Sequence, residues 1–102
     1  MMIVDPGACG FHCKISVNKT GRYEATVTVE SQCKQIKRLA QEVKSVDFMG
    51  IVKGQFGENA VFQAASKCGL HQSCIIPSSI LKAVEAELGM AVKKPVSITF
   101  EV

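Results

Sequence analysis

Two cysteines and a histidine, Cys68, His71 and Cys74, lie within seven residues of one another. Pro77 follows soon after, and because proline is favoured at the first position of a helix, the spacing predicts that a helix begins there. The free N–H groups and positive dipole end of that helix would lower the pKa of a thiol just ahead of it. Thiolates bind metals or attack disulfides, so we expect any chemistry here to involve Cys74.

Two further cysteines lie at the ends of predicted elements. Cys9 is in the turn-forming segment 5–10, and Cys33 is in the first turn of a predicted helix. Such ends can converge at one edge of a two-layer fold. Three thiols and an imidazole suffice for tetrahedral zinc, and thiolates also suit iron-sulfur clusters. We therefore expect zinc or an iron-sulfur cluster to be bound by Cys9, Cys33, His71 and Cys74, with the three cysteines as the cluster-binding thiols.

Two other interpretations stay open. Cys74 could be the nucleophile of a thiol-based redox protein in which Cys68 or Cys9 is the resolving thiol. Alternatively, the cysteines only pack, because cysteine is among the residues most often buried, and the chain is a protein-interaction module. We favour packing for Cys13 and Cys68, which share the faces of apolar residues on a strand and a helix. No catalytic residue is assigned, so binding is favoured over catalysis.

The segments that must position these residues follow two periodicities. Residues 11–17 and 23–29 alternate between apolar and polar, and the turn at 18–22 joins them into an antiparallel hairpin. Phe11, Cys13 and Ile15 are expected to point inward, as are Tyr23 and the valines after it. Residues 96–102 alternate again and are expected to add a third strand to this hairpin.

Helical spacing of apolar residues predicts one helix after Ser31, which would be its N-cap, one from Glu58 and one from Pro77. Gly69 and Gly89 end the last two. Asp47 could cap a short helical piece at 48–52, but the glycines in 47–57 leave that region unassigned. The expected fold is α+β: a small antiparallel three-stranded sheet, formed by the hairpin and the C-terminal strand, with about three helices on one face.

Composition sets limits on the class of protein. A chain of 102 residues that is 47% hydrophobic should form one domain, residues 1–102. An odd number of cysteines, five, and no recognisable signal peptide favour reduced thiols in the cytoplasm. A net charge of +3 is too modest to indicate a nucleic-acid partner, and no apolar run is long enough to span a membrane.

The order of these features resembles the NifU/IscU-type iron-sulfur scaffold domain. Ala8-Cys9-Gly10 before the hairpin, Cys33 at the helix start, and Leu70-His71-Gln-Ser-Cys74 before the last helix look like its three cysteine motifs. The resemblance implies that Cys9, Cys33, Cys74 and His71 are cluster ligands and that a protein partner belongs to iron-sulfur or redox metabolism. Two residues separate His71 from Cys74, where scaffolds usually have none, and Phe11 replaces the usual acidic residue.

The segment around Cys74 carries two further likenesses. Ser73-Cys74-Ile-Ile-Pro77 is similar to the small domain known by its Thr-Ser-Cys-Pro-Asp signature, which is found in some ribonucleotide reductases. The chain also looks like a small uncharacterised family from anaerobic bacteria that carries His-x-x-Cys-x-x-Pro, for which the resemblance implies no activity.

Overall fold

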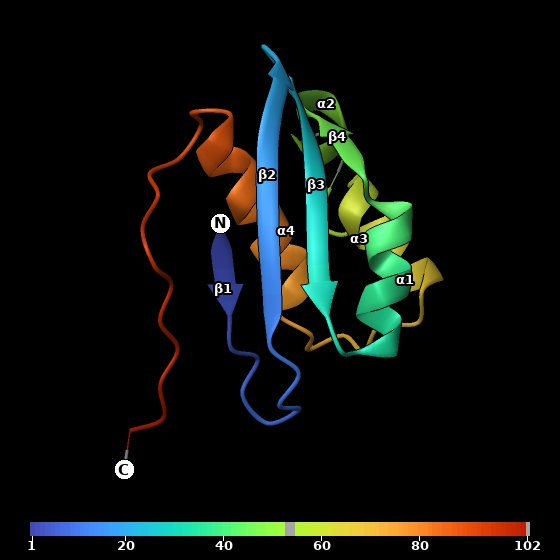
Figure 1. The fold of residues 1–102 in the computed structure, drawn as a ribbon, viewed down its shortest axis with the longest axis vertical. Coiled ribbons are helices and arrows are strands. Elements are labelled where there is room, and N and C mark those ends of the chain that lie inside the picture. The colour runs from blue at the N-terminus through green and yellow to red at the C-terminus, as the bar shows by residue number, and fades with distance from the viewer. Residues whose placement is uncertain (53–54, 102) are drawn as a thin grey trace.

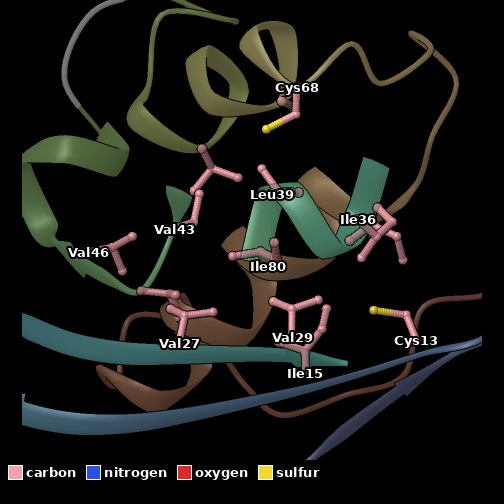
Figure 2. Packing of buried hydrophobic residues seen from close by; sticks show 14 residues of the cluster. Cys13, Ile15, Val27, Val29, Ile36, Leu39, Val43, Val46, Cys68 and Ile80 are labelled. Atoms are coloured by element: carbon pink, nitrogen blue, oxygen red, sulfur yellow. The ribbon is translucent and has the colours of Figure 1, made fainter. Parts of the chain in front are cut away.

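The computed structural model describes residues 1–52 and 55–101, which form an α+β fold (Figure 1). The elements in chain order are β1 (Met2–Val4), β2 (Cys13–Gly21), β3 (Glu24–Ser31), α1 (Lys34–Glu42), β4 (Ser45–Asp47), α2 (Phe48–Val52), α3 (Ala60–Lys67) and α4 (Ile76–Glu87). The strands form one antiparallel sheet in the order β1-β2-β3-β4. Helices α1, α3 and α4 lie on one face of it, as expected from the sequence (Figure 2).

The predicted hairpin is confirmed as β2 and β3. Ile15 pairs with Val29 and Val17 with Val27, so their apolar side chains share one face of the sheet. Along β3 every second residue from Ala25 is buried, and the residues between them are exposed. The inward placement of two aromatic residues was wrong: Phe11 is 47% and Tyr23 is 55% exposed, because both precede the strands that they were expected to join.

Three helices close the core over the sheet. Their fully buried residues include Leu39 of α1, Val61 of α3 and Ile80 of α4, and Figure 2 shows Leu39 and Ile80 above the valines of β3. The helix predicted from Glu58 begins slightly later, at Ala60. Asn59 is its N-cap, with its side-chain oxygen accepting a hydrogen bond from the Phe62 N–H at 3.0 Å.

The ends of α3 and α4 follow the sequence-based prediction. Gly69 and Gly89 have φ values of 72° and 78°, and each lies two residues past the last residue of its helix. A backbone in this left-handed region suits glycine, which has no side chain to clash. The two predicted helix stops are therefore confirmed.

The predicted C-terminal strand was wrong. Residues 93–101 have no regular secondary structure, and Val96, Ile98 and Phe100 are 58%, 79% and 96% exposed. Alternation shows that a segment suits a strand, but a strand also needs an edge to pair with. In this structure the two edges of the hairpin are occupied by β1 and β4. Val102, part of the same prediction, lies outside the described residues.

Neither edge strand was predicted, because each has only three residues, too few for a periodic signal. Met2, Ile3 and Val4 of β1 pair with Ile15, Lys14 and Cys13 of β2. At the other edge, β4 leads directly into α2, where the Asp47 carboxylate accepts a hydrogen bond from the Gly50 N–H at 2.6 Å. The predicted short helix with an Asp47 cap is therefore confirmed within a region otherwise left unassigned.

None of the helices in the described parts of the chain combines the length and the apolar content that crossing a membrane requires.

Candidate metal centre

Four chain segments that carry cysteines meet at one end of the sheet. They are the segment between β1 and β2, the start of β2, the connection from β3 to α1, and the connection that enters α4, all at the lower end of Figure 1. Antiparallel topology explains this meeting, since β2 begins where β3 ends. These segments carry, in order, Cys9, Cys13, Cys33 and Cys74.

Cys33 is the N-cap residue of α1 and is partly buried. Its thiol donates a hydrogen bond to the Gln35 side-chain oxygen at 3.4 Å, and its N–H donates to the Ser31 hydroxyl oxygen at 3.2 Å. Ser31 thus bonds the chain just ahead of the helix. The prediction that Ser31 is the N-cap of this helix was wrong. No side chain caps α1, and its first turn carries no acidic residue, so the positive end of the helix faces the thiol uncompensated.

Cys74 lies just ahead of α4, where Ile75 is the N-cap and Pro77 follows in the first turn. The Ile76 N–H donates a hydrogen bond toward the sulfur, which lowers the pKa of Cys74 as the sequence argument anticipated. Burial outweighs this effect, however, and negative charge on Cys33 and Cys9 adds to it. The net pKa of Cys74 is raised, so the expectation of a thiol with a lowered pKa was wrong.

Cys13 is the most deeply buried thiol of this group, at 1% exposed. Burial raises the pKa of Cys13 to about 11, and negative charge on Cys74 and Cys33 contributes. The prediction that Cys13 packs in the core is confirmed, and Figure 2 shows it beside Ile36 of α1. Its place next to two other thiols was missed. The available signal was its position: as the first residue of a strand it must lie at the end of the sheet where the preceding loop lies.

Cys9 is exposed and belongs to a glycine-flanked turn, as predicted. Gly7 and Gly10 have φ values of 80° and 74°, and the Gly10 N–H donates to the Gly7 carbonyl at 2.9 Å. The Asp5 carboxylate accepts from the Gly7 N–H at 3.0 Å. Charge on Cys9 raises the pKa of Cys74, so this loop brings its thiol within electrostatic reach of the α4 entrance.

The other two candidates have different environments. His71 is exposed, and its carbonyl accepts a hydrogen bond from the Cys74 N–H at 3.1 Å, which closes the turn before α4. Its imidazole is not among the groups that shift the pKa of Cys74 or Cys13. Cys68 is 5% exposed at the end of α3 and lies apart from Cys13, above Leu39, in Figure 2. The predicted packing role of Cys68 is confirmed.

The thiols of Cys9, Cys13, Cys33 and Cys74 lie near one another but do not form a metal-binding cluster. Within residues 1–52 and 55–101, no three His, Cys, Asp or Glu side chains lie close enough to hold a metal ion. An open hollow of about 740 Å³ lies at this end of the sheet, and its lining includes His12, Ser31 and Lys37. The arrangement can therefore bring thiols together only by a movement of the segments that carry them.

Comparison with known proteins places the chain in one family. The model of a family of unknown function, DUF6951, matches residues 1–100, so the chain belongs to that family. No curated protein matches the chain. No solved structure matches it either.

Proposed function

We propose that this member of the family is a metal-binding domain in which Cys9, Cys13, Cys33 and Cys74 bind zinc or an iron-sulfur cluster through their thiolates. One observation carries the proposal: the four segments that carry these cysteines meet at one end of the sheet, where charge on Cys74 and Cys33 adds to the raised pKa of Cys13 and charge on Cys33 and Cys9 adds to that of Cys74. Four cysteine sulfurs are the ligand set of structural zinc sites and of common iron-sulfur clusters. Cys13 is thus the fourth ligand in this proposal, in place of His71, which was expected from the sequence.

The electrostatics at this end of the sheet favour a bound cation with thiolate ligands. Cys13 and Cys74 hold their protons at neutral pH because burial and neighbouring thiols disfavour the charged form. A metal ion supplies the missing positive charge and replaces those protons. The positive ends of α1 and α4 face the same region with no acidic residue in either first turn, so they stabilise the excess negative charge of a four-thiolate site.

Binding would require the segments that carry these cysteines to move closer together. Sulfurs bound to one zinc ion lie within roughly 4 Å of each other, since each Zn–S bond is about 2.3 Å. Cys13 is fixed in the core, whereas residues 7–12 are exposed and belong to no strand. The segment that carries Cys9 can therefore move toward the buried thiol at the least cost in packing.

The resemblance and the free thiols bear on which metal is bound, on the partner protein and on the compartment. The order of the cysteine segments resembles that of iron-sulfur scaffold domains, which supports a cluster and a protein partner in iron-sulfur or redox metabolism. Five free cysteines in the described residues suit a reducing compartment, so we place the protein in the cytoplasm in this proposal.

The direct test is thermal unfolding of reduced, oxygen-free protein with and without zinc, or with ferrous iron and sulfide. A ligand that binds the folded state raises the melting temperature by mass action. We expect Cys9→Ser, Cys33→Ser, Cys74→Ser and Cys13→Ser each to remove most of that rise. Cys68→Ser is the matched control, since it alters a buried thiol outside the group and should keep the rise.

The same experiment decides between the two candidates for the fourth ligand. If His71→Asn removes the rise and Cys13→Ser keeps it, the ligand set expected from the sequence is correct and the one proposed here is not. If the wild-type melting temperature does not respond to either metal, the metal-binding proposal fails.

The redox alternative has less support, because the raised pKa of Cys74 leaves little thiolate at neutral pH. Alkylation of the metal-free protein tests it. We expect Cys74 to react more slowly than a free cysteine, whereas faster reaction would favour a thiol nucleophile.

A further inference from the structure

The segment after α4 has the composition of a strand but pairs with no strand in the described part of the chain. Val96, Ile98 and Phe100 alternate with Ser97, Thr99 and Glu101, and the three apolar side chains are mostly exposed. Valine, isoleucine, threonine and phenylalanine all favour strands. An extended segment with one apolar side gains stability only when it pairs with a sheet edge and buries that side.

The edge that this segment fits is β1. β1 lies at one end of the strand order and pairs only with β2, so the backbone groups on its other side have no strand partner in the described chain. Met2 and Val4 are partly buried against the core cluster, whereas Ile3 faces the opposite side and is 68% exposed. The other edge strand, β4, is less suitable because exposed Ser45 and Asp47 flank its single buried residue.

The direction of the C-terminal segment relative to β1 indicates whether this edge pairs with the segment of the same chain or with that of a second copy. In Figure 1, β1 and the segment after α4 both run from the top of the view to the bottom, so pairing within one chain would be parallel. Every strand pair in this sheet is antiparallel. A second copy related by a two-fold axis perpendicular to the sheet presents its own C-terminal segment in the opposite direction, which is antiparallel to β1.

Side chains and charge agree with the antiparallel arrangement. With Ile98 opposite Val4 and Phe100 opposite Met2, the apolar residues extend the core-facing side of the sheet, and Thr99 falls beside Ile3 on the outer face. This direction brings the exposed Lys94 toward the end of β1 where Asp5 lies, 70% exposed at its side chain. Parallel pairing would instead bring Glu101 toward the Asp5 carboxylate.

We propose that two copies of this chain form a dimer by exchanging C-terminal strands, in which residues 96–101 of each copy pair antiparallel with β1 of the other. The two exchanged segments then lie side by side between the two β1 strands and join the sheets into one. The dimer is independent of the metal site, because it uses no cysteine.

The test is the mass of the reduced protein in solution, measured by sedimentation equilibrium with chelator and again after metal loading. We expect a dimer of the 11.0 kDa chain in both conditions. Ile98→Asp should produce a monomer, because it puts a charge on the face that packs beside Val4. Thr99→Asp is the matched control, since the same charge on the outer face should leave the dimer intact.

Hydrogen exchange separates the remaining outcomes. In the dimer, amides of residues 96–101 and the β1 amides that point away from β2 should be protected, and Ile98→Asp should remove both protections. A monomeric wild type overturns the proposal, and protection of residues 96–101 in that monomer would show that the segment pairs within its own chain. A dimer that survives Ile98→Asp also overturns it.

Discussion

Replacement of Cys13 by alanine should remove a specific part of the pH dependence of stability in the metal-free, reduced protein. In the folded state burial raises the pKa of Cys13 from 9.0 to about 11. The unfolded chain therefore loses the proton at lower pH than the folded chain does. The contribution of this thiol to stability is complete below pH 9 and is lost progressively as pH rises toward 11.

The magnitude follows from the two pKa values. Between pH 8 and pH 10, a thiol that titrates at 9.0 when unfolded and at about 11 when folded lowers the free energy of unfolding by about 1 kcal/mol. Cys13 is 1% exposed, so water screens its charge only weakly. The other groups of the protein are common to the wild type and the variant, so their contributions cancel in the difference.

Urea unfolding at pH 8 and pH 10, with chelator and reductant, measures the effect. The wild type should lose about 1 kcal/mol more than Cys13→Ala between the two pH values. Cys68→Ala, which also shortens a buried cysteine but keeps Cys13, should retain the wild-type loss. Equal losses in the wild type and Cys13→Ala would refute the argument that burial holds the proton on this thiol.

Two further predictions follow from the same structure. Zinc binding at pH 7.5 should release about two protons per ion or more, because Cys13 and Cys74 are both protonated in the free protein. Calorimetry in buffers of different ionisation enthalpy measures this number. Cys13→Ser should release about one proton fewer, and a release near zero would show that these thiols are not ligands. Leu39→Ala should lower the free energy of unfolding by about 2–5 kcal/mol in urea, because Leu39 is fully buried between the sheet and α3, and a loss below about 1 kcal/mol would mean that the core is packed differently.

The fold could be predicted from the sequence wherever a periodic pattern is long. The alternation in residues 11–17 and 23–29 predicted β2 and β3, although β2 continues to Gly21 through residues that were predicted as the turn, and the apolar spacing after Ser31 predicted α1. Three-residue strands such as β1 and β4 give no such signal, because their pairing depends on the edges that the hairpin offers. The segment 96–101 shows the converse, since its pattern is typical of a strand but a strand requires a partner that local sequence does not specify.

The sequence indicated where three of the four grouped cysteines lie, but not that Cys13 lies with them. Cys33 and Cys74 lie just ahead of α1 and α4, and Cys9 lies in the loop before β2; turn residues and helix-start residues in the sequence indicated these places. Cys13 combines two features. In the alternating pattern of the strand it falls on the side that faces the core, and as the first residue of β2 it lies next to the loops at that end of the sheet. Only the three-dimensional arrangement shows that both apply. The pKa of Cys74 could not be predicted from the helix position, since burial opposes the N–H of Ile76 and no local pattern gives its extent.

X-ray absorption at the zinc edge tests the four-thiolate proposal most directly, using reduced protein loaded with one equivalent of zinc. The proposal predicts about four sulfur neighbours at about 2.3 Å. It also predicts that Cys13→Ser exchanges one sulfur for oxygen or nitrogen, or loses the ion on desalting, whereas Cys68→Ser keeps all four sulfurs. A first shell of nitrogen and oxygen alone, or wild-type protein that retains no zinc after desalting, would contradict it.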